Sequence, residues 1–291
     1  KALAEQKTRE EEAKRKAEED ARLKALAEQK AKEEAERRKL QPQLGARWTN
    51  SLGMAFAPVA GTKVLFGIWD VRVLDYAVYA AANPGVNASW KKVEDEGVPV
   101  SDGLEHPVTM VSWEDAKAFC AWLTKKEQGE GKLAVGQEYR LPTDAEWSYA
   151  VGIGDKEGNG TPGYKSGKLE GVYPWGTGWP PPKGAGNYAD MTSHQKFGGF
   201  IEGYDDGYAT TSPVGSFKAN PYGLYDMGGN VAQWCEDYYN GQSGSRVLRG
   251  ASWYLDGSSS LLSSFRDFRR PDCRGSTLGF RVVVVAAGPV R

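Results

Sequence analysis

The sequence contains few of the residues that redox, metal and nucleophilic sites use most often. Its 291 residues include only 2 histidines and 3 cysteines. The cysteines Cys120, Cys235 and Cys273 form no CxxC pair and no other metal-binding spacing. The histidines His106 and His194 lie far apart in sequence, so a Ser–His–Asp arrangement has few possible members. A catalytic site built on thiol or imidazole groups is therefore disfavoured.

Other features are also absent, and each absence argues against a class of protein. The formal net charge is −1 at pH 7, so we expect no basic face for nucleic acid. No apolar run approaches the roughly 20 residues that a membrane-spanning helix needs. The glycine-rich stretch 152–160 lacks the preceding strand and following helix of a nucleotide-binding loop. Because the chain starts at Lys1 without methionine, we expect a fragment whose signal peptide or lipid anchor would lie upstream.

Composition divides the chain into two unequal parts. Residues 1–40 are almost entirely Lys, Glu, Arg, Ala, Gln and Leu, and they contain no Trp, Tyr, Phe, Gly or Pro. All 10 tryptophans lie in the rest of the chain, which is long enough to bury a sizeable core. We therefore expect a charged helical stalk over residues 1–41, a linker over 42–49 and one globular domain over 50–286.

The stalk is rich in strong helix formers, with Glu–Lys and Glu–Arg neighbours three and four residues apart. The heptapeptide KALAEQK occurs twice, at residues 1–7 and 24–30. Few leucines could occupy the apolar positions of a coiled coil, namely Leu3, Leu23, Leu26 and Leu40. The pattern favours a solvated helix closed by Pro42, and a weak alanine-rich coil that self-associates is the alternative.

The globular part is expected to be α+β with little regular secondary structure. Residues 69–83 are predicted to form the end of a strand followed by a helix. Residues 112–126 predict an amphipathic helix with Ser112 as its N-cap and an apolar face of Ala116, Phe119, Cys120 and Leu123. After Lys126 we expect an irregular chain for roughly a hundred residues, which is too long for an ordinary loop.

An ordered series of sequence blocks resembles the formylglycine-generating enzyme (sulfatase-modifying factor) family. The blocks are NSLGMAF, HPVTMVSWEDAKAFCAWL, YRLPTDAEWSYA, YPWG, SPVGSFKANPYGLYDMGGNVAQW, RVLRGASW and LGFRVV, from about Asn50 to Val285. The ordered set is specific and covers nearly all of the globular part. The resemblance implies a C-type-lectin-like fold of the formylglycine-generating-enzyme type, in which two helices flank a small twisted antiparallel sheet.

The resemblance also implies a chemistry for which this chain lacks the residues. Enzymes of the family oxidise a sulfatase cysteine to formylglycine with two copper-binding cysteines five residues apart. Those positions fall on Leu255 and Ser260, and neither side chain can act as a thiolate nucleophile or a soft copper ligand. We therefore expect no catalytic residues, no copper and no enzyme activity. The alternative within the enzyme class is an oxidase of the same fold with altered chemistry, such as an iron-dependent one.

Members of the family commonly hold two structural calcium ions, and the resemblance places both in this chain. The ligands of the first ion, side-chain and backbone oxygens that suit calcium, fall on Asp190, Met191, Asp206 and Tyr208. The ligands of the second fall on Asp226, Gly229, Val231 and Gln233. The family usually has Glu at the last of these positions, so Gln233 removes one negative charge and weakens the case for the second ion.

Residues 249–281 combine two framework ends with a different middle. The ends RGASW and LGFR enclose a run of Ser, Gly, Asp and Phe with no hydrophobic period. This arrangement resembles the variable regions of proteins diversified by retroelements, in which the adenines of template AAC codons are replaced at random. Randomising the first two bases of AAC never yields Lys, Glu, Gln, Met or Trp, and residues 254–277 contain none of these five.

By this resemblance, twelve residues are predicted to vary and to bind ligand: Tyr254, Leu255, Asp256, Ser258, Ser260, Phe265, Asp267, Phe268, Cys273, Gly275, Ser276 and Thr277. Aromatic residues supply much of the binding energy at interfaces, and Ser and Gly add adaptable hydrogen bonding. Each aromatic is alternatively a core residue of a β-hairpin. The framework positions are expected to include Arg266, Pro271, Asp272 and Arg274, and core residues are expected at Trp253, Leu261, Leu262, Leu278 and Phe280.

The sequence as a whole predicts a non-enzymatic binding protein that displays a diversified surface to an unknown protein or cell-surface ligand. We expect a bacterial source, with the protein at the cell surface or secreted. Two other hypotheses stay open, the altered oxidase and a structural adaptor module in which the stalk is the functional part.

Overall fold

The computed structural model describes residues 2–286, and the chain divides into two compact units, Lys1–Gln41 and Pro42–Arg291. The first unit is one helix, α1 (Ala2–Lys39), of 38 residues. Its described side chains are all exposed, including Leu3, Leu23 and Leu26. Ion pairs along the surface, such as Arg38–Glu34 at 2.8 Å, join neighbours one turn apart. The predicted long charged helix is confirmed.

Across residues 2–286, no helix combines the length and apolar character that crossing a membrane requires.

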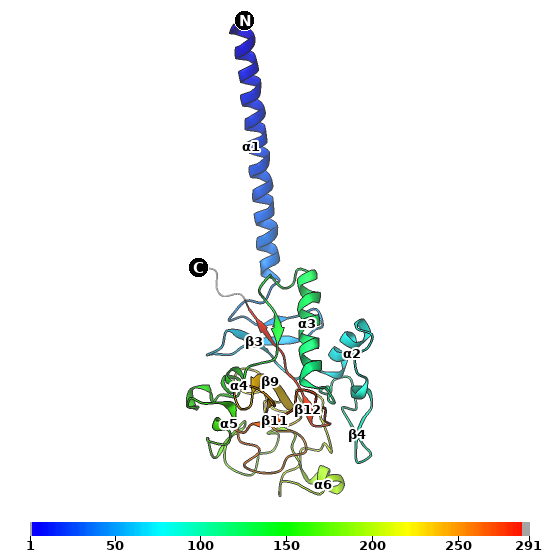
Figure 1. The fold of residues 1–291 in the computed structure, drawn as a ribbon. Helices are drawn as coiled ribbons and strands as arrows, with labels where there is room; N and C mark the ends of the chain where they lie inside the picture. Colours follow the sequence, from blue (N-terminus) through cyan, green and yellow to red (C-terminus); the bar gives the residue numbers. More distant parts are fainter. Residues whose placement is uncertain (1, 287–291) are drawn as a thin grey trace. The chain divides into compact units, whose positions relative to one another are not determined.

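A five-stranded sheet joins the two ends of the globular unit (Figure 1). Its order is β1 (Trp48–Thr49), β2 (Ala55–Pro58), β3 (Val64–Gly67), β13 (Val283–Val285) and β6 (Tyr139–Arg140). Every neighbouring pair is antiparallel. The central strands are buried because they carry continuous apolar runs, VLFG in β3 and VVV in β13. The last sequence block, LGFRVV, is therefore held in the interior of the globular unit.

A four-stranded sheet carries the segment 249–281. Its order is β11 (Asp267–Arg269), β10 (Arg246–Arg249), β9 (Ala232–Tyr238) and β12 (Leu278–Gly279). β10 is antiparallel to both neighbours, whereas β12 runs parallel to β9. Two small hairpins complete the strands, β4 (Val93–Asp95) with β5 (Val98–Val100), and β7 (Val172–Tyr173) with β8 (Gly176–Thr177). The segment thus begins inside this sheet and supplies both of its edges.

The two predicted helices of the globular unit are confirmed as α2 (Val73–Ala82) and α3 (Trp113–Gly129). The Ser112 hydroxyl accepts a hydrogen bond from the backbone N–H of Asp115 at 3.1 Å, which caps α3 as expected. The predicted apolar face of α3 is buried. Tyr76 of α2 stacks on Phe119 of α3 with ring centroids 5.9 Å apart, so aromatic side chains join the two helices.

The expectation of an irregular chain after Lys126 was wrong in part. Short helices interrupt it: α4 (Asp144–Val151), α5 (Pro162–Lys165) and α6 (Met191–Phe197), with a 3₁₀ turn at Gly154–Lys156. Another 3₁₀ turn, Ser89–Lys91, lies earlier in the chain. A capping box starts α4, because Thr143 and Glu146 each bind the backbone N–H of the other, at 3.1 and 2.9 Å. Residues 198–231 contain no helix and no strand, in keeping with the expected low content of regular structure.

Candidate functional site

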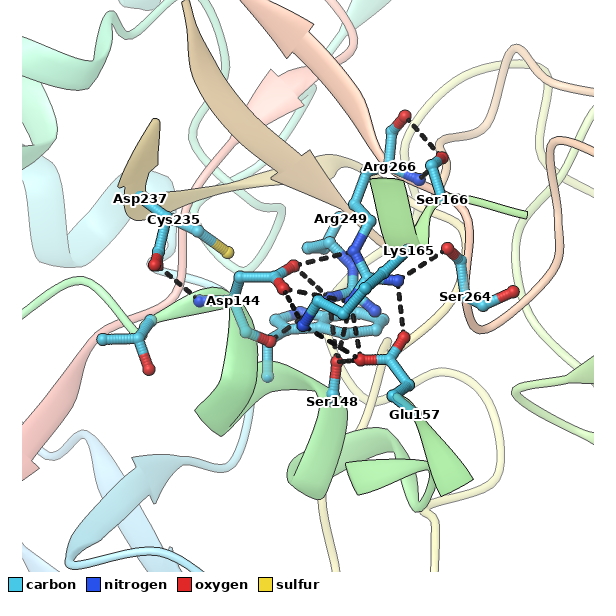
Figure 2. Close-up of polar contacts among 12 residues, drawn as sticks. Asp144, Ser148, Glu157, Lys165, Ser166, Cys235, Asp237, Arg249, Ser264 and Arg266 are labelled. Carbon is cyan, nitrogen blue, oxygen red and sulfur yellow. Dashed lines mark hydrogen bonds and ion pairs between the residues drawn. The ribbon is translucent and has the colours of Figure 1, made fainter. Parts of the chain in front are cut away.

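A buried ion-pair network fixes both ends of the loop between β10 and β11 (Figure 2). At one end, Arg249 donates to Asp144 Oδ1 at 2.5 Å and to the Ser263 carbonyl at 2.8 Å. At the other end, Arg266 donates to both Asp144 oxygens, at 2.9 and 3.0 Å, and to both Glu157 oxygens, at 2.5 and 2.7 Å. Both arginine side chains are fully buried. The start of α4 therefore anchors the two flanks of the predicted variable loop.

The carboxylates of this network are ionised at neutral pH. Burial by itself raises the pKa of Asp144, but the charges of Arg249 and Arg266 and a bond from Lys165 hold that pKa well below its ordinary value. Burial also raises the pKa of Glu157, but hydrogen bonds from Arg266 outweigh this effect. The pKa of Glu157 therefore lies below its ordinary value. Lys165 Nζ lies 2.8 Å from Asp144 Oδ2. The loop is thus held by charge-assisted bonds in a dry environment.

All twelve residues predicted to bind ligand reach solvent. Tyr254 and Phe268 are 46% and 44% exposed, so neither is a core residue, and Phe265 is half-buried. The residues expected in the core are buried: Trp253, Leu261, Leu278 and Phe280, together with Arg266. Leu262, also expected there, is half-buried against the cluster that contains Tyr173 and Leu261. Between Tyr254 and Thr277 the chain thus combines buried framework residues with positions that face solvent.

The twelve residues do not lie in a single place along the sheet. Asp267 and Phe268 belong to the edge strand β11, where Phe268 contacts Tyr239 with ring centroids 4.3 Å apart. Ser276 and Thr277 precede β12 at the opposite edge, and the Ser276 hydroxyl donates to the Asp95 carboxylate. β10 and β9 lie between these edges.

A third group of the twelve residues, Tyr254, Leu255 and Asp256, lies beside α6. This helix is at the lower end of the globular unit in Figure 1. The backbone N–H of Ala189 donates to the Leu255 carbonyl at 3.2 Å, which joins the start of this helix to the variable segment. A small pocket of about 90 Å³ opens between them, lined by Ala189, Ser193, Phe197, Gly199, Trp253, Tyr254 and Asp256. Sequence reasoning missed Ser193 and Phe197, because they lie outside residues 249–281. His194 lies on α6 and is exposed.

Leu255 and Ser260 stand at the two positions where the family resemblance implies cysteines. Leu255 packs against the cluster of Ile201 and Leu261, and the Ser260 backbone N–H donates to the Gly257 carbonyl at 2.9 Å. The thiols of Cys120 and Cys235 are buried in two different hydrophobic clusters, and burial raises the pKa of both. Neither thiol is therefore ionised or accessible at neutral pH.

The first predicted calcium set brings two carboxylates together. Asp190 caps α6 through Ser193 N–H at 2.7 Å, and its other oxygen accepts from Asp206 N–H at 2.8 Å. Burial and the neighbouring charge of Asp190 raise the pKa of Asp206 to about 8, against backbone bonds that lower it. No cationic side chain of residues 2–286 forms an ion pair with either carboxylate. The raised pKa of Asp206 reflects two carboxyl groups held close together without a cation, and a calcium ion coordinated by these oxygens and by the carbonyls of Met191 and Tyr208 would fit there.

The second predicted calcium set does not fit an ion. The Gln233 amide oxygen accepts from Trp147 Nε1 at 3.0 Å and from Arg281 Nε at 3.2 Å. Its amide nitrogen donates to the Asp226 carbonyl at 2.7 Å, and Arg281 donates to the same carbonyl at 3.4 Å. A buried guanidinium therefore already supplies positive charge there. Neither set contains three or more His, Cys, Asp or Glu side chains grouped for a metal, among the described residues.

The fold defines a C-type-lectin-like domain of the type found in formylglycine-generating enzymes. Residues 20–286 match the family described as the sulfatase-modifying factor enzyme 1-like domain, and the chain belongs to this family. The resemblance inferred from the sequence blocks is confirmed.

The relatives include proteins named as active and as inactive. The chain is 35% identical over 215 residues to the inactive C-alpha-formylglycine-generating enzyme 2 of Bos taurus, covering 71% of this chain and 59% of that protein. It is 34% identical over 168 residues to the formylglycine-generating enzyme of Thermomonospora curvata, covering 58% and 45%. The chain thus spans about three-fifths or less of the length of these relatives.

Solved structures share the fold. PvdO from Pseudomonas aeruginosa superposes with a TM-score of 0.54 at 22% identity, covering 83% of this chain and 98% of that one. Treponema denticola variable protein 1 superposes with a TM-score of 0.50 at 22% identity, covering 82% and 98%. The C-type-lectin-like α+β fold expected from the sequence is confirmed.

Proposed function

We propose that this chain is a non-enzymatic ligand-binding protein whose binding face consists of retroelement-diversified residues between Tyr254 and Thr277. The observation that carries the proposal is the distribution of burial in this segment. None of the twelve positions predicted to vary is buried, whereas the residues that hold the segment, such as Trp253, Leu261 and Arg266, are buried. A relative named as inactive and a variable protein of the same fold support the proposal.

The arrangement separates the stability of the fold from the choice of ligand. Arg249, Arg266 and Asp144 fix the flanks of the loop through bonds that involve none of the twelve varying side chains. Substitutions at exposed positions away from such anchors usually change the free energy of unfolding little. The segment can therefore take many sequences on one framework. The ligand we propose is a protein or another cell-surface molecule, met by a bacterial protein displayed outside the cytoplasm.

We also propose that one calcium ion binds at Asp190, Met191, Asp206 and Tyr208. Asp190 is the N-cap of α6, so the ion would stabilise the helix that lies beside Tyr254 and Asp256. In this role calcium is structural and takes no part in a reaction.

Two matched libraries test the function. One randomises the twelve positions predicted to vary, and the other randomises the buried residues of the same segment, including Trp253, Leu261 and Arg266. We expect most members of the first library to fold, as judged by protease resistance on display, and selection on a protein target to yield binders. The second library should lose folded members. Equal loss of folding in both, or no binders from the first against several targets, would contradict the proposal.

An activity assay distinguishes the proposed binding function from the alternative that the chain is an oxidase with altered chemistry. The purified chain, incubated with copper or iron and a sulfatase-type cysteine peptide, is expected to leave the peptide thiol unchanged. Conversion of the thiol to an aldehyde would overturn the non-enzymatic assignment.

A further inference from the structure

Aromatic rings form the corner of the pocket beside α6. The ring of Phe197 contacts the rings of both Trp253 and Tyr254, with centroids 5.0 and 5.9 Å away. The rings of Trp253 and Tyr254 are 5.4 Å apart and almost perpendicular. Trp253 is buried and forms a fixed part of the wall, whereas Tyr254 is nearly half exposed and Phe197 is half-buried. The pocket thus presents aromatic surface that solvent can reach.

A carboxylate without a partner completes this pocket. Asp256 lines the pocket and is exposed. Its Oδ2 approaches Gly199 so closely that a Cβ atom added to this glycine would lie 2.9 Å from it. No hydrogen bond or ion pair engages the Asp256 carboxylate within residues 2–286. By contrast, the Ser193 hydroxyl in the same wall is committed to the backbone of Asp190. The pocket therefore offers a carboxylate that is free to bind a ligand.

We propose that this pocket takes the cationic side chain of a lysine or arginine on a protein ligand. The inference rests on the proposed function and specifies the chemistry of one part of its binding face. Aromatic faces attract cations within about 6 Å of the ring, and a carboxylate beside them adds a charge-assisted bond. A volume of about 90 Å³ suits one side chain and is well below the roughly 300 Å³ of small-molecule sites.

The pocket also divides into constant and varying parts. Phe197 and Trp253 lie outside the predicted varying positions, so the proposed diversification would leave them unchanged. Tyr254 and Asp256 are predicted to vary, so the residue at position 256 sets the charge that the pocket accepts. Versions of the protein with a neutral or basic residue at 256 would prefer a different ligand side chain.

Blocked amino acids test the pocket directly. N-acetyl-lysine and N-acetyl-arginine methylamides are titrated into the full chain, with the norleucine analogue as an uncharged control of similar length. We expect saturable NMR shifts of the Phe197, Trp253 and Tyr254 ring signals with one or both cations, and much weaker shifts with norleucine. Asp256→Asn should weaken binding of the cation by roughly tenfold, the loss of one charge-assisted bond. The control Asp272→Asn, at an exposed framework position that does not line the pocket and is not one of the twelve, should leave it unchanged.

Several results would overturn the inference. They are equal shifts with norleucine, no saturable shift with either cation, or no effect of Asp256→Asn in a protein whose melting temperature is unchanged. None of these would touch the wider proposal, because libraries of the twelve positions could still yield binders through β11 or the residues before β12. If the libraries yield no binders but the pocket still binds the cation, the chain would instead have a fixed cation site on a scaffold that is not diversified.

Discussion

Asp144 stands at the start of α4 and is bound by cationic side chains from three separate parts of the chain. Arg249, Arg266 and Lys165 all lie within 3 Å of its carboxylate oxygens. Its backbone N–H donates to Asp237 at 2.6 Å, so the residue is fixed on all sides. Removing one partner from such a group leaves the others buried without compensation, which costs more than the ion pair itself contributes.

The variant Asp144→Asn is therefore expected to lower the free energy of unfolding by about 3–5 kcal/mol, because the buried Arg249 loses its carboxylate partner and the buried Arg266 loses one of its two. Urea denaturation at pH 7 measures this change. The matched control is Asp272→Asn, which removes an exposed carboxylate 2.9 Å from Arg270 and should leave the stability almost unchanged. Similar effects of the two variants would contradict the anchoring role of Asp144.

The same network makes stability depend on pH on the acid side. The pKa of Asp144 in the folded protein lies well below its unfolded value of about 3.9. The unfolded state therefore binds the proton first, and the contribution of Asp144 is full above about pH 4 and is lost as the pH falls toward the folded pKa. Melting temperatures measured from pH 7 to pH 2 should show the wild type losing its advantage over Asp144→Asn. A constant difference across this range would be inconsistent with the assignment.

At the scale of single residues, the sequence identified framework and surface positions but not their partners. Trp253, Leu278 and Phe280 are buried as expected, because large apolar side chains in framework blocks are usually buried in the core. The role of Arg266 was predicted only as a framework position. Its binding to Asp144 and Glu157 joins residues more than a hundred positions apart, and no local pattern in a single sequence records such a contact.

At the scale of elements, long periodic segments were predictable and short ones were not. α3 has 17 residues and a clear capping box, so both its start and its buried face followed from the sequence. α4 has 8 residues and most strands have 2 to 4, too few for a hydrophobic period to emerge. The Thr143–Glu146 capping box was the available signal for α4.

The helix α6 gives a prediction about calcium. Adding calcium to protein first stripped with a chelator should raise the melting temperature, since an ion that binds only the folded state stabilises it by mass action. Asp206→Asn should abolish this response. Asp205→Asn is the matched control, because Asp205 is an exposed neighbour whose carboxylate binds Thr192. A calcium response that survives Asp206→Asn, or none in the wild type, would contradict the proposed site.

At the scale of the whole molecule, α1 and the globular unit are separate compact units. Deleting residues 1–41 is therefore expected to leave the melting temperature of the globular unit and its ligand affinity unchanged. Calorimetry and a binding titration of the truncated and full chains measure both quantities. Loss of binding on truncation, with the fold intact, would favour the adaptor hypothesis in which the stalk is the functional part.

The central claim is that selection has kept the framework of residues 249–281 while a retroelement rewrites its exposed positions. Sequencing the DNA next to the gene tests this claim most directly. The account predicts a near-copy of the codons for Arg249 to Arg281 beside a reverse transcriptase gene, differing almost only at adenines and at the codons of the twelve residues predicted to vary. A flanking region with no such repeat would contradict it, and the segment would then be a fixed loop of the family's fold.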